Sequence, residues 1–542
     1  MASPRGQTIL IQALMRGLAT SCAGEADGRP GVQCFETHLS WVLVAGAFAY
    51  KVKKAVRFEF VDFSTLAARR SCCEAELRLN RRLATDLYLA VEPITGSIMH
   101  PQLGGSSGAI EYVLKMRAFD QSALWTERIA DRSLSSIEVD SLARQIAAFH
   151  ESTDRAGPAS AWGSAAIVQQ TADDNLKQLL LLQTGAGEAD ALKRLARWQG
   201  DQHTALGSTF DRRKNEGFVR ECHGDLHAGN VVTIDGRVAA FDCIEFSDAL
   251  RWIDVISDIA FIDMDIVCRG MPVLAAQLLD RYLSQTGDYA GLSVLRYYRT
   301  QRALVRATVG LLREGQHRST AQDASTGDPE AGQALRYLRF ALHAMKPPVT
   351  AIMITHGLSG SGKSTFAQSL LELTGAIRLR SDVERKRLHG VAATAGRVAG
   401  VDTGMYAAGS NASTYLHLIT LARQVIAAGF AVIVDAAFLG KAQRSAFRAL
   451  AGELDVPFFL FDLHASPDTL RRRITFREAS REDPSDATLA VLEHQFRNRE
   501  PLADDDTTGT IVIDAEAPLD RRTVAQSCKA VLLALKIGDA AP

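Results

Sequence analysis

The chain has 542 residues, more than one hydrophobic core of usual size accommodates, which predicts two or three domains, with two as the working number. Hydrophobic residues make up 47% and charged residues 23%, a globular composition that excludes a fibrous or wholly disordered chain. Lys and Arg number 61 and Asp and Glu number 62, so the formal net charge is −1. No global electrostatic field therefore favours nucleic acid or an anionic membrane as a partner.

The cysteines and the N-terminal segment bear on the compartment. Eight cysteines are scattered without a CxxC pair, and several, such as Cys243, lie in apolar stretches. This pattern predicts reduced, buried thiols in a cytoplasmic protein. Residues 1–20 lack a small-residue cleavage site and are expected to form a short amphipathic helix. The longest apolar run, 41–50, is about half of the roughly 20 residues that a spanning helix needs, so no membrane span is predicted.

The first part of the chain predicts a small β-rich lobe followed by a larger helical one. Strand-like runs lie at 40–46 and 48–56, a helix is expected over 66–83, and 110–114 is a further strand candidate. Helical patterns then dominate to about residue 312. The first part is therefore expected to be a bilobal α+β domain.

A polar stretch separates this part from the rest. Residues 313–333 contain no large apolar side chain and are rich in Ser, Thr, Gly, Gln and Asp, a composition typical of an exposed linker. A short helical segment, 334–345, follows, and Pro347-Pro348 ends it. The β-branched run 349–355 then leads into a glycine-rich loop, as the first strand of a parallel α/β sheet does. The predicted organisation is a first domain over 1–315, a linker and connecting helix over 316–346, and a second domain over 347–542.

The most informative segment of the first domain is RECHGDLHAGNVVTIDGRVAAFD, residues 220–242. It places Asp225 five residues before Asn230, and Asp242 ends an apolar strand that follows a tight Asp235-Gly236 turn. Phosphoryl transfer needs one carboxylate to accept the proton of the attacking hydroxyl. It also needs an amide oxygen and a second carboxylate to hold Mg²⁺ against the phosphates. The alternative, a polar turn between two strands, does not account for the downstream strand and its terminal Asp.

The string HGDLHAGN, which starts at His223, resembles the catalytic loop of the aminoglycoside phosphotransferase and choline kinase group of the protein-kinase-like superfamily. The resemblance covers roughly the first 315 residues and implies a kinase-like fold that uses ATP. It implies Asp225 as the catalytic base, Asn230 and Asp242 as Mg²⁺ ligands, and His223 as a residue that shapes the loop. Unlike protein kinases, the small lobe has no GxGxxG loop, and THLS at 37–40 stands in its place.

The same resemblance implies a phosphate-binding lysine in the small lobe. Lys51 would contact the α and β phosphates and pair with Glu76 on the following helix, with Glu74 as the reserve. Lys53 and Lys54 remain alternatives, because either of them could make the phosphate contact while Lys51 is only a solvated strand residue.

A run of acidic residues follows the motif, with Arg251 as the one base among them. Two interpretations stay open: an acidic wall for a cationic acceptor such as an amino sugar, or, as favoured here, acids that cap helices and brace the catalytic loop. Two of them, four residues apart, would share a helix face. The six acids are Glu245, Asp248, Asp254, Asp258, Asp263 and Asp265.

The second domain opens with HGLSGSGKST, residues 356–365, which fits GxxxxGK[ST] between a strand and an apolar helix. The glycines allow backbone N–H groups to surround phosphate oxygens at a helix N-terminus, Lys363 neutralises the β and γ phosphates, and Ser364 reaches Mg²⁺. A chance match rarely has both flanking elements, so the segment predicts a nucleotide-binding P-loop. The predicted nucleotide-binding residues are Gly357, Ser359, Gly360, Ser361, Gly362, Lys363, Ser364 and Thr365.

Further polar residues follow the P-loop at strand ends and on a helix. Asp382 follows a strand candidate, and Asp435 ends the apolar strand AVIVD, where it can hold Mg²⁺ through water or serve as the base instead. Arg473, Arg477 and Arg481 are spaced four apart on one helix face. That face is either a lid over the transferred phosphate or a solvated surface.

Together these features resemble the gluconate kinase and zeta-toxin type of P-loop kinase over 349–535. The resemblance implies a parallel α/β sheet and the use of ATP with Mg²⁺. It also implies that Asp382 contacts or deprotonates the acceptor hydroxyl, that Arg385 helps to bind the acceptor, and that Arg473 and Arg477 stabilise charge on the transferred group.

The leading interpretation is a bifunctional ATP-dependent phosphotransferase whose two domains each move the γ-phosphate of Mg-ATP to a hydroxyl of a small molecule, with sugars or amino sugars as the expected class. One alternative is that one domain is a nucleotide-binding regulator, for which the first domain, without its glycine loop, is the candidate. Another is a toxin-like or protein-directed kinase. The neutral charge and the lack of aromatic-rich basic stretches predict no nucleic-acid partner. The oligomeric state stays open.

Overall fold

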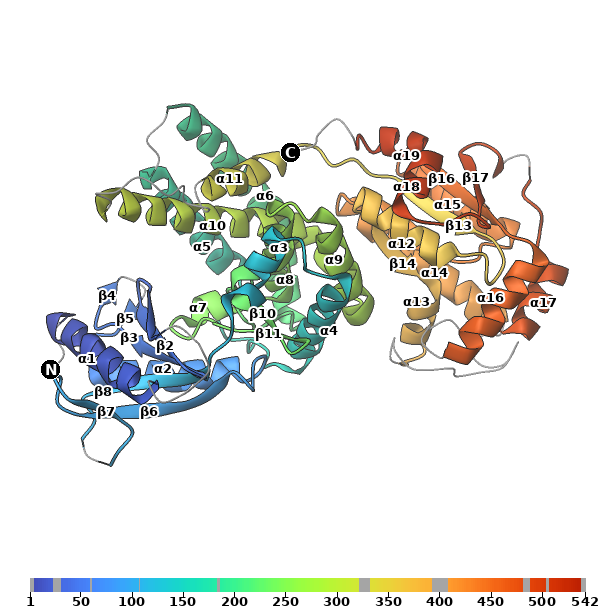
Figure 1. The fold of residues 1–542 in the computed structure, drawn as a ribbon. Helices are drawn as coiled ribbons and strands as arrows, with labels where there is room; N and C mark the ends of the chain where they lie inside the picture. The colour runs from blue at the N-terminus through green and yellow to red at the C-terminus, as the bar shows by residue number, and fades with distance from the viewer. Residues whose placement is uncertain are drawn as a thin grey trace. The chain divides into compact units, whose positions relative to one another are not determined.

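The structure is a computed structural model that describes residues 4–22, 31–58, 61–106, 108–182, 186–320, 332–391, 408–480, 488–503 and 506–537 (Figure 1). The chain divides into two compact units. Unit 1 consists of Met1–Asp174 and Gly207–Arg269, and unit 2 of Asn175–Leu206 and Gly270–Pro542. The domain boundaries predicted from the sequence stay a prediction. Within the described ranges, no helix combines the length and the apolar character that crossing a membrane requires.

The small lobe of unit 1 is an antiparallel sheet of six strands in the order β1-β2-β3-β8-β6-β7. Its apolar face packs against helix α1 (Pro4–Cys22), whose Leu10 and Leu14 contact the core around Leu43, Val52 and Val113. The amphipathic N-terminal helix and the three predicted strands are confirmed; β6 and β7 were not predicted. The strands are β1 (Gln33–Glu36), β2 (Ser40–Ala45), β3 (Phe48–Lys53), β6 (Tyr88–Gly96), β7 (Pro101–Leu103) and β8 (Glu111–Arg117). A separate ribbon pairs β4 (Arg57–Phe58) with β5 (Val61–Asp62).

Helix α2 (Leu66–Asn80) packs on this sheet against β6 and β8. Thr65 caps its N-terminus by accepting a hydrogen bond from the Ala68 N–H. The predicted helix over 66–83 is confirmed but ends three residues earlier. At that end the Asn80 side-chain amide donates to the Glu76 carbonyl and accepts from the Cys243 N–H, which ties the end of α2 to the catalytic segment.

The larger lobe of unit 1 carries the motif segment on short elements packed against α8 (Val255–Cys268), most of which is buried. Strands β10 (Val231–Ile234) and β11 (Arg237–Ala240) form the predicted hairpin. Its turn residues Asp235 and Gly236 both have positive φ, 49° and 74°, as a tight two-residue hairpin turn requires. The other elements are η1 (Gln121–Ala123), α3 (Trp125–Ala130), α4 (Ser136–Ser152), β9 (Val219–Glu221), η2 (Ala228–Asn230), α7 (Asp248–Arg251) and β12 (Trp252–Asp254), with α5 (Ala165–Leu182) and α6 (Ala186–Asn215) reaching the division between the units.

Unit 2 begins its longer segment with helices. These are α9 (Pro272–Thr286), η3 (Tyr289–Gly291), α10 (Leu292–Thr320) and α11 (Gln333–His343). The expectation of a loop from residue 313 is wrong up to Thr320, because α10 continues that far; Arg, Glu and Gln in this stretch favour helix although they are polar. The remainder of the predicted linker, 321–331, lies outside the described residues. Helix α11 confirms the predicted helical segment.

The rest of unit 2 is a parallel five-stranded sheet in the order β14-β15-β13-β16-β17. Its central strands β13 and β15 are buried on both faces, which explains their continuous apolar runs, whereas the edge strand β17 exposes Val512. On one face, α12 and α18 cover a core around Met353, Ile433 and Phe461. The α/β prediction is confirmed. The strands are β13 (Ile352–His356), β14 (Ile377–Arg380), β15 (Val432–Asp435), β16 (Phe458–His464) and β17 (Thr510–Asp514); the helices are α12 (Lys363–Thr374), α13 (Ser381–Leu388), α14 (Ala408–Ala427), α15 (Lys441–Glu453), α16 (Pro467–Ser480), α17 (Leu489–Asn498), α18 (Arg521–Ser527) and α19 (Lys529–Ala534).

Candidate active sites

The catalytic-loop segment of unit 1 brings Asp225 and Asn230 together. The Asn230 side-chain amide donates to the Asp225 carbonyl at 3.0 Å and to its carboxylate at 3.1 Å. Because this amide nitrogen is engaged, the Asn230 side-chain oxygen is the atom available to a cation. The Asp225 carboxylate is partly exposed, and the His227 ring lies 3.4 Å from it. One carboxylate is thus oriented by a buried amide and still open to solvent.

Asp242 meets the two predicted residues of the small lobe. Its carboxylate lies 2.5 Å from Lys51 Nζ, which also lies 2.7 Å from Glu76 Oε1. The Asp242 N–H donates to the Tyr88 hydroxyl at 3.1 Å, a contact that the sequence did not indicate. Burial raises the pKa of the Asp242 carboxyl, but the Lys51 ammonium outweighs it and brings this pKa below its usual range. The reserve residue Glu74 instead makes an exposed ion pair on the surface of α2.

A second lysine completes this network. Lys53 Nζ lies 2.5 Å from Glu76 Oε2 and also pairs with Glu245. Lys51 and Lys53 are two apart on β3 and therefore share a face of the strand. Lys53 is only 2% exposed and Glu76 is 0% exposed, so Lys53 holds the site together, and Lys51, at 13%, is the more exposed of the two lysines. Lys54 pairs with a glutamate of β1 instead.

The turn at 37–40, which replaces a glycine loop, is closed on itself. The Thr37 hydroxyl accepts hydrogen bonds from the N–H groups of Leu39, at 3.3 Å, and Ser40, at 3.0 Å. The Thr37 N–H in turn donates to the Ser40 carbonyl at 2.8 Å. These three amides are engaged inside the turn, so they are not offered to a phosphate in this structure.

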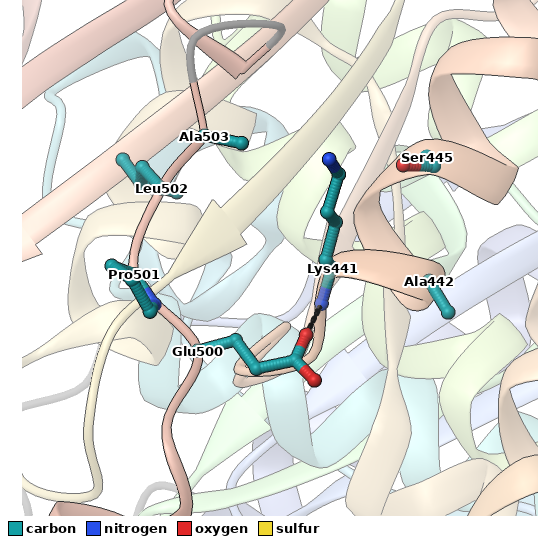
Figure 2. Close-up of a pocket in the computed structure, with 7 residues that line it drawn as sticks. All are labelled: Lys441, Ala442, Ser445, Glu500, Pro501, Leu502 and Ala503. Carbon is teal, nitrogen blue, oxygen red and sulfur yellow. Dashed lines mark hydrogen bonds between the residues drawn. The ribbon is translucent and has the colours of Figure 1, made fainter.

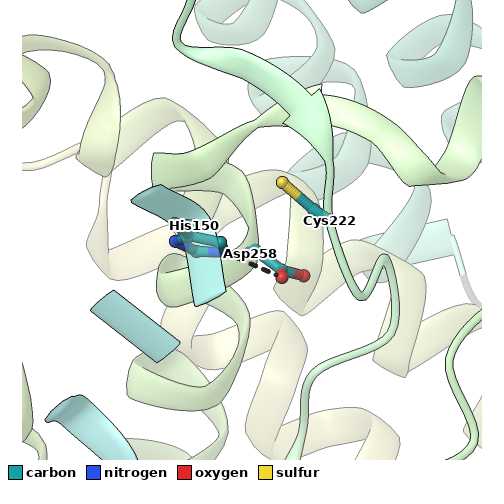
Figure 3. Close-up of side chains that lie close together, drawn as sticks. All are labelled: His150, Cys222 and Asp258. Carbon is teal, nitrogen blue, oxygen red and sulfur yellow. Dashed lines mark hydrogen bonds and ion pairs between the residues drawn. The ribbon is translucent and has the colours of Figure 1, made fainter. Parts of the chain in front are cut away.

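Asp258 binds the backbone of the loop that begins at His223. Its two carboxylate oxygens each accept a loop N–H at 2.9 Å, from His223 and from Gly224, and His150 Nε2 lies 3.2 Å away. Figure 3 shows His150, Cys222 and Asp258 gathered around this point. These are metal-ligand types, but the oxygens of Asp258 already accept hydrogen bonds and the Cys222 thiol lies against a backbone carbonyl. The cluster is a brace of the loop.

The other acids after the motif also have structural partners. Asp254 caps α8 through the Ile256 N–H and pairs with Arg213, both of which are buried. Asp265 accepts the Ala228 N–H of the loop at 2.9 Å. Glu245 pairs with Lys53, Asp248 pairs with Arg251, and Asp263 is buried within α8. The structure thus favours the helix-capping and bracing interpretation over an acidic wall.

His223 uses both ring nitrogens in its neutral form. Nε2 lies 2.9 Å from the Phe241 carbonyl, to which it must donate, and Nδ1 lies 3.3 Å from the Asp225 N–H, from which it accepts. Burial lowers the pKa of His223, because removal from water disfavours the charged form of the ring. The ring therefore fixes the backbone of the loop at Asp225.

The P-loop of unit 2 has the backbone that its glycines predict. Gly357, Gly360 and Gly362 have φ of 143°, 83° and 87°, and a Cβ at Gly357 would lie 2.9 Å from the Leu463 carbonyl. Lys363 begins α12, and its ammonium donates to the Leu358 carbonyl at 2.8 Å. The remaining predicted residues, Ser359, Ser361, Ser364 and Thr365, lie on the same loop and on the first turn of α12.

Two carboxylates lie beside this loop. Asp435 is buried at the end of β15, and its Oδ2 has no hydrogen-bond partner in the described part of the chain; Arg380 Nε is 3.9 Å from it. A buried carboxylate oxygen of this kind fits a cation. The pKa of Asp382 is raised, chiefly by burial and also by the nearby charge of Asp435. The positive charges of Arg385, Arg380 and Lys363 oppose this rise. The structure therefore brings Asp382, Asp435 and Lys363 within electrostatic reach of one another.

Of the predicted lid arginines, Arg473 lies over the P-loop. Its guanidinium donates to the Ala515 carbonyl at 2.7 Å and to the Gly360 carbonyl at 3.4 Å. The side chain of Arg477 and the whole of Arg481 lie outside the described residues. Arg385 donates to the Asn411 side chain at 3.3 Å.

A hollow near α15 is separate from these residues. The Lys441 N–H donates to the Glu500 carboxylate at its rim (Figure 2). None of the predicted site residues lines it. Its lining consists of Lys441, Ala442, Ser445, Glu500, Pro501, Leu502 and Ala503.

Family models match the two predicted site regions separately. Residues 56–296 match the phosphotransferase enzyme family, and residues 352–502 match an AAA domain model that covers P-loop kinases. The chain joins a phosphotransferase domain to a P-loop kinase domain. Both resemblances inferred from the motifs are confirmed at this level. The kinase domains make the protein an enzyme that transfers phosphate to hydroxyl groups, and kinase families of this type use ATP.

Two curated relatives match most of the chain. Uncharacterised proteins of Mycobacterium tuberculosis and Mycobacterium bovis are 29% identical over 478 residues, which is 87% of this chain and 92% of each relative. A choline/ethanolamine kinase family protein from Mesorhizobium loti covers 62% of this chain and 96% of its own, at 14% identity and a TM-score of 0.38. A gluconokinase from Sinorhizobium meliloti covers 36% and 99%, at 18% identity and a TM-score of 0.26. Both TM-scores are low, so nothing about function follows from them.

Proposed function

We propose that the protein is a bifunctional ATP-dependent phosphotransferase, in which each kinase domain moves the γ-phosphate of Mg-ATP to a hydroxyl of a small molecule. The observation that carries the proposal is that each unit has its own lysine in the segment predicted to bind phosphates. In unit 1, Lys51 lies between Glu76 and Asp242. In unit 2, Lys363 lies in the P-loop, within electrostatic reach of Asp382. A protein catalyses phosphoryl transfer mainly by positioning the reactants and by neutralising the charge on the phosphates.

In unit 1, Asp225 is the proposed base. Its carboxylate accepts the proton of the acceptor hydroxyl while the hydroxyl oxygen bonds to the γ-phosphorus and the bond from that phosphorus to the leaving ADP oxygen breaks. Lys51 neutralises the α and β phosphates. Asn230 and Asp242 would hold Mg²⁺, which supplies further neutralisation of the phosphates when bound.

In unit 2, Asp382 is the proposed base, because its raised pKa suits a group that must take up a proton. Ser364 and the buried oxygen of Asp435 would hold Mg²⁺. The P-loop amides and Lys363 bind the phosphates. Arg473, over the loop, and Arg477 stabilise charge on the transferred group.

The proposed acceptor is a hydroxyl-bearing small molecule of the sugar class. The acids after the catalytic loop are engaged in structural contacts, which removes the main argument for a cationic amino sugar. The proposed compartment is the cytoplasm. In its favour, the cysteines that the structure describes are free thiols, and most of them are buried.

A second candidate function is that unit 1 binds nucleotide as a regulator of unit 2. It is favoured by the closed turn at 37–40, whose amides are engaged with Thr37. ATP consumption by Asp225→Ala and Lys363→Ala, made singly and together in the full chain, separates the two functions. Two active kinases predict partial loss in each single variant and full loss in the double variant. If unit 1 is only a regulator, Asp225→Ala is expected to consume ATP at the same rate as the unchanged chain.

A further inference from the structure

The strand that leads to Asp382 lies at the edge of the P-loop sheet. Among the strands that the structure describes, β14 pairs with β15 alone, and its last residue is followed at once by α13, which carries Asp382 on its first turn. An edge strand and a helix of eight residues have few neighbours of their own sheet to hold them. Within unit 2, α9 contacts β14, and η3 contacts α14, which in turn contacts β14 and α13; α9 and η3 both precede the P-loop in the chain.

A buried ion pair fastens β14 to α9. The guanidinium of Arg378 binds both oxygens of Asp280, at 2.6 and 3.2 Å. Both side chains are under a tenth exposed, 8% for Arg378 and 9% for Asp280. Two parallel hydrogen bonds fix the direction of a guanidinium as well as its distance. The same guanidinium reaches the Ser364 carbonyl of the P-loop helix at 3.5 Å.

Helix α13 itself is held by contacts with α9 and η3. Arg387 donates to the Ser284 carbonyl at 2.7 Å and pairs with Glu384. Tyr289 of η3 is buried, and its ring carries its hydroxyl to the neighbourhood of Glu384 and Arg387. Gly287 lets Arg387 lie this close, since a Cβ there would lie 2.6 Å from the guanidinium.

The anchored side of α13 is not the side of Asp382. Glu384 is two residues beyond Asp382, which places the two side chains on roughly opposite faces of the helix. Glu384 is buried against η3 and α14, whereas Asp382 lies toward Asp435 and Lys363. The contacts with α9 and η3 therefore set the direction in which Asp382 points.

We propose that Asp280 and Tyr289 are positioning residues of the P-loop kinase, acting through Arg378 and Glu384 on the helix that carries Asp382. This inference rests on the proposed function of the P-loop site. If the inference holds, the P-loop kinase needs residues 272–291 for activity, although they lie well before the P-loop in the chain.

The test uses the full chain with Asp225→Ala, so that ATP turnover which depends on Lys363 reports the P-loop site. Asp280→Asn keeps the size of the side chain and removes its charge. Tyr289→Phe keeps the ring and removes only the hydroxyl, and it provides the second variant should Asp280→Asn not fold. Each variant is expected to lower kcat for ATP hydrolysis by about 10- to 100-fold, the scale of a small misplacement of a catalytic group. KM for ATP is expected to stay within about twofold, because the nucleotide is held by β13 and α12.

A structural readout accompanies the kinetics. Hydrogen exchange of the α13 amides, 381–388, is expected to rise in both variants while that of β13, 352–356, stays protected. Asp280→Glu is expected to restore part of kcat, because it restores the charge. The matched control is Glu453→Gln, which breaks an exposed ion pair with Arg423 in the same unit and is expected to change neither readout.

Unchanged exchange and unchanged kcat in both variants would overturn the inference, as would a KM for ATP that rises as much as kcat falls. If the parent chain shows no ATP turnover that depends on Lys363, the proposed function of the site fails. The exchange of α13 still decides, in that case, whether α9 and η3 position it.

Discussion

The ammonium of Lys51 lies 2.5 Å from the carboxylate of Asp242, although 191 residues separate them in the chain. The same ammonium also holds Glu76 on α2. One cation thus joins a strand of the small lobe, a helix of that lobe and the end of the catalytic segment. A change at Lys51 therefore tests whether this junction is a nucleotide site.

In a Lys363→Ala background, Lys51→Met is expected to lower the remaining kcat/KM for ATP by about 10²- to 10³-fold, as the loss of one preorganised charge does in other sites. Steady-state phosphate release measures it. Lys54→Met, directly after the end of that strand, is the matched control, since Lys54 pairs with a glutamate of β1 outside the site. Equal losses in the two variants would contradict the assignment.

Asp258→Asn is expected to lower the free energy of unfolding by about 1.5–3 kcal/mol, the scale of hydrogen bonds to a charged group. An amide has only one acceptor oxygen, so it leaves one of the loop N–H groups of His223 and Gly224 without a partner. Urea denaturation followed by fluorescence gives the value. Asp248→Asn, at an acid that is 58% exposed, is expected to change it by less than about 0.5 kcal/mol. A result in which both variants behave alike would show that Asp258 does not brace the loop.

The lowered pKa of His223 predicts that the protein loses stability on acidification. Between the ordinary histidine value of about 6.5 and the lower value in the folded state, the unfolded chain binds a proton that the folded chain does not. The free energy of unfolding should therefore fall as pH falls below about 6.5. Urea midpoints measured in steps from neutral to mildly acidic pH follow this. In His223→Gln, which keeps a donor for the Phe241 carbonyl but does not titrate, the slope should be smaller; an unchanged slope would assign the proton elsewhere.

Arg473→Ala is expected to lower turnover at the P-loop site by about 10²-fold, with Mg-ADP affinity changed only a few-fold. The reason is that a charge held over the loop acts on the transferred group more than on the bound product. Turnover in an Asp225→Ala background and calorimetry with Mg-ADP measure the two effects. Arg472→Ala, at an exposed neighbour, is the control. Loss of Mg-ADP binding with kcat preserved would instead make Arg473 a support of the loop backbone.

The two motif loops could be predicted because their information is local. The Asp235-Gly236 turn fixes the hairpin that carries Asp242 back toward Asn230, and the glycines of the P-loop determine its backbone. Asp225, Asn230 and the P-loop residues are therefore recognisable from the amino-acid sequence alone. The parallel sheet follows from its unbroken apolar strands in the same way.

Contacts between distant segments could not be predicted. Lys53 and Glu245 are 192 residues apart, and no local pattern distinguishes Lys53 from Lys51 or Lys54. Arg378 lies on β14, and its partner Asp280 lies 98 residues earlier in the chain. The polar composition after residue 313 suggested a loop, but helix propensity carried α10 to Thr320. In each case the outcome depends on packing, which one sequence does not display.

The sharing of Glu76 between two lysines limits how the first kinase can be controlled. With one oxygen held by Lys51 and the other by Lys53, α2 can swing away from the sheet only by breaking two ion pairs at once, after which Lys51 keeps Asp242 and Lys53 keeps Glu245 as partners. Movement of α2 is therefore not expected to switch this domain between active and inactive states. The small lobe is expected to stay assembled with its nucleotide site empty, which leaves entry of the acceptor as the step open to control.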